Sequence, residues 1–203
     1  HNSIDLQKIQ NVSPAEINAG PDDTKILVSG GFLPTKGIHI AVEVARQLKE
    51  KGFPFKLIIT GVVYDYRGSK AYYRKILQMI EDYALTDHIQ LEIGRSSVLQ
   101  FFKASDIFMH PSDTEGLPRV IMEAMAFRVP VVANAVGGVV DYVLDGYTGV
   151  ITRYNNVDDY VDAIMRIPSD PALRKRITDN AYELIETCYR PEQQVNAFER
   201  SLQ

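Results

Sequence analysis

Short apolar runs alternate with amphipathic stretches along most of the chain. Residues 25–29 and 55–60 are rich in branched apolar side chains and are each followed by glycine, which is typical of buried strands. Between them, apolar residues recur every three or four positions over residues 38–51, the spacing of a helix with one buried face, and Gly52 stands where helices commonly end. Strands that alternate with helices predict a parallel sheet with helices on both faces, joined by right-handed crossovers.

The same alternation continues to the end of the sequence. Another helix is predicted to begin at Pro118, because proline suits the first turn of a helix. No internal repeat, low-complexity tract or linker interrupts the order, so the prediction is one α/β, Rossmann-like domain over residues 1–203. Further strands are predicted at residues 89–93, 107–112, 129–133 and 149–152, and further helices at residues 70–83, 98–104, 138–144, 157–167, 172–187 and 192–202, with a break at residues 168–171.

Composition agrees with a globular protein and excludes several classes. Of the 203 residues, 45% are hydrophobic and 24% charged, and the net charge of −4 argues against a nucleic-acid partner. Cys188 is the only cysteine, so we expect a buried, inert thiol and neither a disulfide framework nor a cysteine metal cluster. No apolar run reaches the ~18 residues of a membrane span, which predicts a cytoplasmic protein, or one at the inner face of a membrane in its full-length form. The first residue is His1 rather than Met, so we expect a fragment of a longer protein.

Two glutamates bracket the start of the helix predicted at Pro118. Glu115 lies in the loop after an apolar strand, and Glu123 lies between one and two turns into the helix, since a turn takes ~3.6 residues. A helix start offers unpaired N–H groups and a positive dipole end to an anion. Two carboxylates beside such a site favour a ligand with phosphate and several hydroxyls, such as a nucleotide-sugar. The spacing alone also permits solvated glutamates or a dipole partner in the first turn.

Four motifs follow one another in this part of the chain. They are Glu115-Gly-Leu-Pro-Arg-Val-Ile-Met-Glu123-Ala-Met-Ala, Val129-Pro-Val-Val-Ala, Gly137-Gly138 and Asp145-Gly-Tyr-Thr-Gly149. Together they resemble family 4 of the retaining glycosyltransferases, and the likeness extends from His1-Asn-Ser-Ile-Asp5 to the last predicted helix. The resemblance implies the carboxyl-terminal, donor-binding half of the two-domain GT-B fold, with the amino-terminal acceptor domain absent.

The resemblance also implies an activity and roles for single residues. The implied activity is metal-independent transfer of a sugar from a nucleoside-diphosphate sugar, with UDP- or GDP-sugars favoured, to a hydroxyl of an acceptor glycan or lipid-linked glycan. Glu115 would contact the donor sugar near the reacting centre, Lys36 would balance the charge of the diphosphate, and Glu123 would accept hydrogen bonds from the ribose hydroxyls. Without the resemblance, Lys36 and Glu123 would pass for surface residues. The other candidate donor-binding residues are Gly30, Gly31, Gly94, Arg95, Gly116, Leu117 and Pro118.

One of these positions departs from the family pattern. Gly31 stands where the family usually has an arginine, five residues before Lys36, so the phosphate site lacks one of two cations. The backbone of Gly30 and Gly31 could instead cradle the phosphate. Alternatively, another cation could substitute, namely Arg95, Arg119 or Arg67.

Several further residues stay outside the predicted site. Tyr64 and Tyr66 could stack on a base or sugar, but loop tyrosines are more often partly buried surface residues. His110 has no motif partner and is expected to be a structural histidine. Arg128 replaces a glycine of the family pattern, and a left-handed backbone there costs a residue with a side chain ~1 kcal/mol or more, so we expect a local adjustment of the fold. No Asp-x-Asp motif or histidine cluster is present, so no metal site is expected.

Two alternatives remain open from the residues, and a third is disfavoured. A starch- or glycogen-synthase-type enzyme shares the fold and similar glutamates but uses a different donor. A non-catalytic nucleotide-binding or interaction module would be compatible with glycine at position 31. A generic dehydrogenase or signalling domain is disfavoured, because no Gly-x-Gly-x-x-Gly motif follows the first strand. The expected partners are a nucleotide-sugar donor and the protein's own amino-terminal domain, with no separate cofactor, no nucleic acid and no membrane span.

Overall fold

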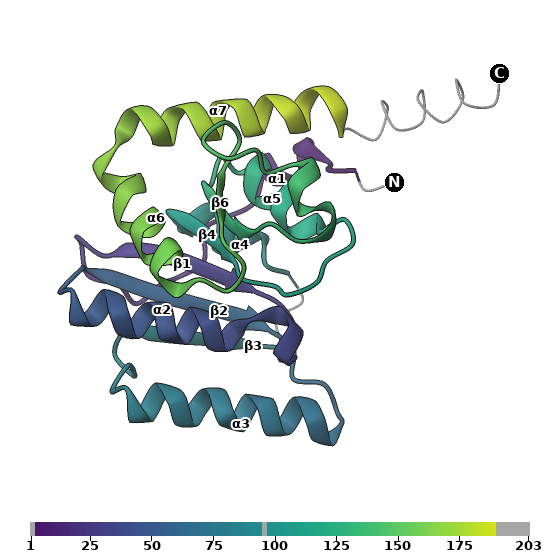
Figure 1. Cartoon of the computed structure of the whole chain (residues 1–203). Helices are drawn as coiled ribbons and strands as arrows, with labels where there is room; N and C mark the ends of the chain where they lie inside the picture. The colour runs from purple at the N-terminus through teal and green to yellow at the C-terminus, as the bar shows by residue number, and fades with distance from the viewer. Residues whose placement is uncertain (1–2, 95–96, 190–203) are drawn as a thin grey trace.

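The structure is a computed structural model that describes residues 3–94 and 97–189, and a single parallel sheet forms its centre (Figure 1). The order across the sheet is β3-β2-β1-β4-β5-β6, and each neighbouring pair is parallel. The predicted α/β, Rossmann-like fold class is therefore confirmed. The strands are β1 (Thr24–Ser29), β2 (Phe55–Gly61), β3 (Ile89–Ile93), β4 (Ile107–His110), β5 (Val131–Asn134) and β6 (Val150–Thr152).

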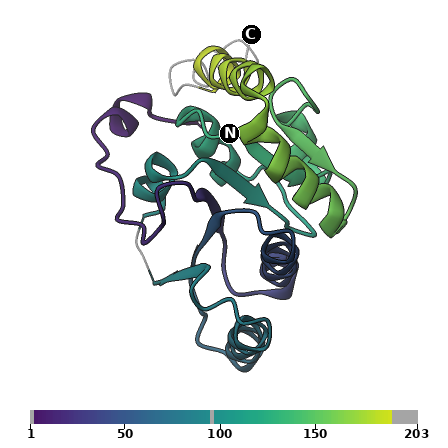
Figure 2. The ribbon, with the colours of Figure 1, turned by 90° about the vertical axis from the view of Figure 1, so that its left-hand side faces the viewer.

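Helices connect these strands and cover both faces of the sheet. Figure 2, turned by 90° from Figure 1, shows the short purple helix α1 and the dark blue helix α2 on opposite sides of the strands. Two short 3-10 helices, η1 (Pro34–Lys36) and η2 (Gly137–Asp141), lie in loops. The α-helices are α1 (Leu6–Gln10), α2 (Ile38–Glu50), α3 (Arg67–Asp82), α4 (Leu99–Ala104), α5 (Arg119–Ala126), α6 (Val157–Ser169) and α7 (Pro171–Cys188).

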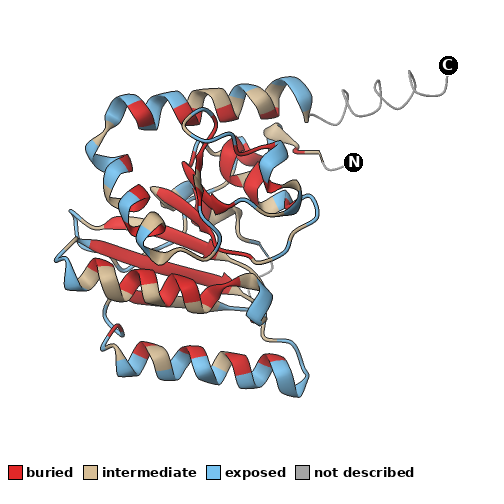
Figure 3. Ribbon diagram, in the orientation of Figure 1, coloured by how far each residue is buried: buried red, intermediate tan, exposed pale blue. Residues whose placement is uncertain are grey.

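Alternate residues of the central strands point into two separate cores. In β1, Ile26 and Val28 pack with residues of α2, α3 and α6, whereas Leu27 packs with residues of α4 and α5. In β4, Met109 and Phe108 divide between the same two cores. These strand residues are almost completely buried, as the red strands of Figure 3 show. Burial on both faces explains why the strand sequences are continuously apolar rather than alternating.

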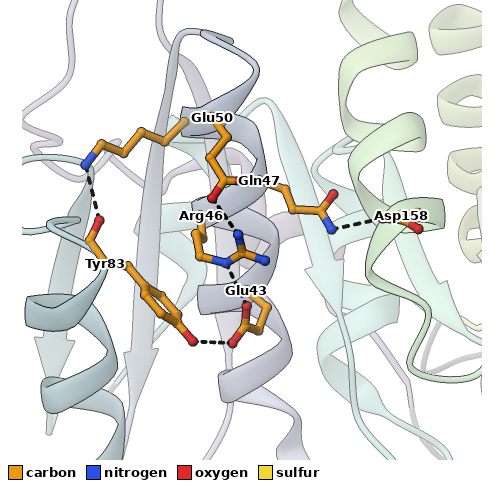
Figure 4. Close-up of polar contacts among 7 residues, drawn as sticks. Glu43, Arg46, Gln47, Glu50, Tyr83 and Asp158 are labelled. Carbon is orange, nitrogen blue, oxygen red and sulfur yellow. Dashed lines mark hydrogen bonds and ion pairs between the residues drawn. The ribbon is translucent and has the colours of Figure 1, made fainter.

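The outer surface of α2 is tied to its neighbours by polar contacts (Figure 4). Glu43 accepts hydrogen bonds from the Tyr83 hydroxyl at 2.6 Å and from Nε of Arg46 at 3.0 Å. Gln47 donates to Asp158 in α6 at 2.9 Å. These contacts fix the position of α2 relative to the end of α3 and to α6.

The turn between α5 and β5 differs from the sequence prediction. Val129 donates its N–H to the end of α5 at 3.0 Å, and Pro130 has no N–H, so β5 starts at Val131 rather than at residue 129. Arg128 keeps a left-handed backbone, with a φ of 57°, and its guanidinium lies 4.0 Å from the centre of the Tyr182 ring in α7. The fold thus accommodates Arg128 and uses its side chain to anchor the turn.

Other element boundaries also differ from the prediction. α6 continues through Pro168, so the predicted break at residues 168–171 is confined to Asp170, whose side chain accepts a hydrogen bond at the start of α7. Instead of the helix predicted over residues 138–144, the structure has the short η2 at Gly137–Asp141. α3 starts at Arg67 rather than at residue 70, and β4 ends at His110 rather than at residue 112. α1 has no counterpart in the prediction, and the predicted helix over residues 192–202 lies outside the described residues.

Three single features complete the comparison with the sequence. Gly52 has a φ of 68° just after α2, which confirms its helix-ending position. Cys188 is exposed at the end of α7, so the expectation of a buried thiol is wrong. No described helix is long and apolar enough to cross a membrane. Within residues 3–94 and 97–189, no group of three or more histidine, cysteine, aspartate or glutamate residues is arranged to hold a metal ion.

Candidate functional site

The strand order brings two distant loops together. β1 and β4 are neighbours at the centre of the sheet, although β2 and β3 lie between them in the sequence. β1 leads into the loop that contains η1 and Lys36, and β4 leads into the loop that contains Glu115. Neighbouring parallel strands end at the same edge of a sheet, and the point where the strand order reverses is the usual ligand site of open α/β sheets.

The structure joins the two predicted catalytic side chains directly. Nζ of Lys36 donates a hydrogen bond of 2.8 Å to Oε1 of Glu115, across 79 positions of sequence. Only 11% of the Glu115 side chain is exposed, compared with 30% for Lys36. The carboxylate is therefore nearly enclosed, and the ammonium group retains access to the solvent from which an anion would approach.

His110 is a third member of this cluster. It is the last residue of β4, it is only 3% exposed, and its Nε2 lies 3.1 Å from the same Oε1 of Glu115. Nε2 has no hydrogen-bond partner among the described residues, so this contact is a close approach of two polar atoms. The expectation of a purely structural histidine therefore missed its contact with Glu115. The position of His110 at the end of β4, five residues before Glu115, is the sequence feature that could have indicated this contact.

The surroundings of Glu115 decide its charge. Burial opposes ionisation, but His110, Lys36 and Ser112 together outweigh it and lower the pKa of Glu115 from an ordinary 4.5 to about 2. Glu115 is thus ionised at neutral pH, and it places a fixed negative charge beside Lys36.

This lowered pKa predicts how stability depends on pH. A carboxyl group whose pKa is lower in the folded state stabilises the fold above its unfolded pKa, and this contribution is lost as the pH falls through the folded pKa. We expect the stability advantage of the wild type over Glu115→Gln to be full above pH 4.5 and to disappear as the pH falls toward about 2. Urea unfolding of both proteins across this range measures it.

Glu123 supplies a control of opposite sign for that experiment. Burial raises the pKa of Glu123, although Arg119 opposes this effect. Ionised Glu123 therefore costs stability as the pH rises, so the difference between the wild type and Glu123→Gln should move in the other direction. If both variants showed the same pH dependence, the proposed surroundings of Glu115 would be contradicted.

Two glycines allow the Glu115 loop to lie close to the loop after β5. A Cβ atom at Gly137, whose φ is 48°, would lie 1.8 Å from the carbonyl oxygen of Glu115, and one at Gly138 would lie 2.3 Å from that of Gly116. The Gly138 N–H donates to the Gly116 carbonyl at 2.8 Å. The Gly137-Gly138 pair of the sequence motif is thus required by backbone contact with the loop that carries Glu115.

Two side-chain amides support the same loop. Asn134 is fully buried at the end of β5 and donates to the Ser112 carbonyl at 3.1 Å. Asn155 donates to Asp113 at 2.9 Å, and the Asp113 N–H donates to the Thr35 carbonyl at 2.8 Å, next to Lys36. These residues link the Glu115 loop to the Lys36 loop. Sequence reasoning missed both asparagines, because they lie outside the motifs and meet the loop only in three dimensions.

Glu123 lies on α5 and has a partner of its own. Nε of Arg119 donates to Oε1 of Glu123 at 3.0 Å, and only 16% of the Glu123 side chain is exposed. Among the contacts of the described residues, none joins Glu123 to the pair of Lys36 and Glu115. The Arg119 side chain is largely exposed, and its guanidinium forms an ion pair with Glu123.

The start of α5 resembles the predicted helix start with a shift of one residue. Pro118 occupies the N-cap position, and Arg119 is the first residue of the helix. The Leu117 side chain is exposed, and a side chain at Gly116 would meet nothing within 4 Å. The backbone on this side of the loop is therefore accessible to a ligand.

Gly30 and Gly31 lie at the end of β1, beside a small cavity. A Cβ atom at Gly31 would lie 2.5 Å from Cε2 of Tyr64, so a tyrosine ring occupies the space that any side chain at position 31 would need. The cavity has a volume of about 250 Å³. Its lining consists of Ser29, Gly30, Gly31, Thr60, Gly61, Val62, Ser97 and Val98.

The remaining predicted residues lie near the end of β3 and the start of α3. Gly94 has a φ of 73°, and its N–H donates to the Gly61 carbonyl at 2.8 Å, so it borders the same region. Arg95 lies outside the described residues. Arg67 is exposed at the start of α3. None of these observations assigns a substitute for the cation that the family pattern places at position 31.

A larger cavity lies away from these residues. It has a volume of about 560 Å³ and borders Lys56 and Ile89, near the starts of β2 and β3, together with residues of the segment 14–18. No predicted site residue lines it. The chemistry of Lys36 and Glu115, rather than cavity size, therefore identifies the candidate site.

The chain is similar to several known proteins. The sequence pattern of the family described as "Glycosyl transferases group 1" matches residues 10–184. A protein of Methanocaldococcus jannaschii described as an uncharacterized glycosyltransferase is 34% identical over 160 residues, which cover 77% of this chain and 42% of that protein. The chain thus spans less than half the length of this relative.

Two solved structures have a similar fold. Anabaena HepE in complex with UDP gives a TM-score of 0.78 at 23% identity, over 90% of this chain and 50% of that chain. The carboxyl-terminal domain of a glycosyl transferase group 1 family protein, LpcC, from Francisella tularensis gives a TM-score of 0.76 at 23% identity, over 90% of this chain and 98% of that chain. At these identities the likeness concerns the fold.

Proposed function

The chain belongs to the glycosyl transferases group 1 family, and on this premise we propose that residues 1–203 form the donor-binding domain of a retaining transferase of family 4. The domain binds a nucleoside-diphosphate sugar, and an amino-terminal domain of the same protein supplies the acceptor side. The second point is supported by length, since the chain spans 42% of a relative and matches 98% of a solved carboxyl-terminal domain.

One observation carries the proposal, namely the contact of Lys36 with Glu115 at the point where the strand order reverses. A cation and a nearly enclosed carboxylate meet there, 2.8 Å apart. The cation can balance the negative charge of the donor diphosphate. The carboxylate can stabilise the positive charge that develops on the sugar. The UDP in the HepE structure supports a nucleotide as the ligand class.

In the proposed reaction, Lys36 and Glu115 stabilise the two opposite charges that develop as one bond breaks. The bond between the anomeric carbon and the diphosphate oxygen breaks, and its electron pair leaves with the nucleoside diphosphate. Lys36 turns toward the diphosphate and balances this growing negative charge without requiring a metal ion. Glu115 stabilises the positive charge that develops on the sugar ring. The acceptor oxygen bonds to the anomeric carbon, and its proton passes to the departing diphosphate.

Glu123 is proposed to hold the ribose hydroxyls of the donor. Replacing Glu123 by alanine should weaken binding of UDP about tenfold to a hundredfold, because hydrogen bonds to a charged group contribute about 1.5–3 kcal/mol. Isothermal titration calorimetry with UDP-, GDP- and ADP-sugars measures this and identifies the base.

Glu50→Ala is a matched control for this variant. Glu50 also belongs to an arginine–glutamate pair with i,i+4 spacing, but on the outer surface of α2, so its removal should leave binding unchanged. A preference for ADP-sugars would favour a starch- or glycogen-synthase-type enzyme. If the wild-type protein bound none of these donors, a non-catalytic interaction module would replace the present proposal.

A further inference from the structure

The cavity beside Gly30 and Gly31 differs in chemistry from the site of Lys36 and Glu115. Among the described residues that line it, none has a charged side chain, whereas Lys36 and Glu115 form an ion pair. The two places adjoin, because a Cβ atom at Gly30 would lie 3.4 Å from Cβ and Cγ of Lys36. A ligand that spans both would have an uncharged end, a central anion next to Lys36 and a further part at Glu115.

A buried polar atom of the cavity wall lacks a partner. Thr60, near the end of β2, is 3% exposed, and its hydroxyl makes no hydrogen bond to another described residue. A buried hydroxyl without a partner is unfavourable unless a ligand or water satisfies it. The uncharged end of the ligand should therefore carry a polar group that can pair with Thr60.

One aromatic ring lies against a residue of the cavity lining, a second ring is stacked on it, and both are open to solvent. Tyr64 is 44% exposed and Tyr66 is 50% exposed, and their rings are stacked with centres 6.5 Å apart and planes at 28°. Tyr64 covers Gly31, one of the residues that line the cavity. Its backbone is fixed, because the Tyr64 N–H donates to the hydroxyl of buried Ser69, which in turn donates to the Phe32 carbonyl. The Tyr64 backbone is thus anchored, and its ring lies against Gly31 at the end of β1.

We propose that Tyr64, supported by Tyr66 and made possible by glycine at position 31, is the wall on which the nucleobase of the donor stacks. This inference rests on the proposed function and adds a specificity-determining residue to it. The base is planar and uncharged and has polar edges, one of which reaches the Thr60 hydroxyl. The diphosphate then lies at Lys36 and the sugar at Glu115, in the order in which these groups are joined in the donor.

Gly31 and Tyr64 form one unit in this proposal. A methyl group at position 31 would overlap the end of the tyrosine ring, which is a flexible side chain and can move away without disrupting the backbone. Gly31→Ala should therefore weaken nucleotide binding by displacing the ring. In a protein that already carries Tyr64→Ala, the same change should have no further effect.

The test is titration of UDP and GDP into wild-type protein and variants, with proton NMR of the bound base. We expect Tyr64→Ala to weaken UDP binding about tenfold, in line with the contribution of one aromatic ring stacked on a base. It should also abolish the upfield shift of the uracil H5 and H6 signals that ring stacking causes. Tyr64→Phe keeps the ring and should bind as the wild type does, and Tyr154→Ala, which removes an exposed tyrosine elsewhere, should have no effect.

The outcomes separate the two proposals. If UDP and GDP bind the wild type and Tyr64→Ala binds both equally well, or if the uracil signals do not shift, the role of Tyr64 is overturned while the donor-binding function stands. If the wild type binds neither nucleotide, the proposed function fails first. Circular dichroism of each variant checks that the fold is kept, and the Gly31→Ala, Tyr64→Ala pair provides an independent measurement.

Discussion

Replacing Glu115 by glutamine should lower the rate of sugar transfer by the full-length protein about a hundredfold to a thousandfold, with little change in donor affinity. The substitution keeps the size of the side chain and removes its charge. That charge matters most when the sugar becomes positive, so its loss affects the transition state more than the bound donor. Removal of one preorganised electrostatic group costs about this much in other enzymes. Steady-state kinetics with the donor identified by calorimetry gives kcat and KM separately.

A second glutamate provides the control for this experiment. Glu43 is also paired with an arginine, at 3.0 Å, but it lies on the outer surface of α2. Glu43→Gln should leave kcat unchanged if the effect at Glu115 is specific. A Glu115→Gln protein with the kcat of the wild type would contradict the proposed role and would favour a nucleotide-binding module without catalysis.

The second large effect is expected at Gly37, the residue between η1 and α2. Replacing Gly37 by alanine should lower the free energy of unfolding by about 3 kcal/mol or more and abolish donor binding. Gly37 has a φ of 65°, and a Cβ atom there would lie 1.9 Å from the carbonyl oxygen of Pro111, a backbone atom that cannot move freely. The clash would push the loop of Lys36 away from the loop of Glu115. Urea unfolding and calorimetry measure the two effects.

Gly52 separates the two causes of that destabilisation. Its φ is 68°, almost the same as that of Gly37, but a Cβ atom there would meet nothing within 4 Å. Gly52→Ala should therefore cost only the ~1–2 kcal/mol of a left-handed backbone and leave donor binding intact. Equal losses of stability in both variants would show that the contact between Gly37 and Pro111 does not hold the two loops together.

The sequence was sufficient for most of the fold because its signals are local. The apolar run at residues 55–60 and the glycine after residues 38–51 fix a strand and a helix end, whatever the rest of the chain does. Boundaries were misplaced where a tertiary contact competes with the local pattern. Val129 is apolar enough for a strand, but its N–H closes the end of α5. Proline usually ends a helix, yet α6 continues through Pro168 for one more residue.

The residues of the candidate site also fall into two groups, those that the sequence indicates and those that only the structure reveals. Glu115, Lys36 and Glu123 stand out through motifs, since their spacing from glycines and strand ends is visible in one dimension. His110, Asn134 and Tyr64 do not belong to these motifs. Their importance comes from contacts that appear only in the folded chain, such as that of the Tyr64 ring with Gly31. Gly31 illustrates the difference. The sequence shows only a missing cation there, whereas the structure shows that a tyrosine ring occupies the position.

By itself, the sequence determined the α/β class and the resemblance to a family, and it singled out two charged residues as candidates for the site. It could not determine that these residues touch. Lys36 and Glu115 are 79 positions apart, and their contact exists because β4 pairs with β1 rather than with β3. Strand order depends on how two apolar faces are covered by helices, which is a property of the whole domain. Only the tertiary structure therefore decided that a nearly enclosed carboxylate, an ammonium group and a cavity whose described lining is uncharged lie side by side.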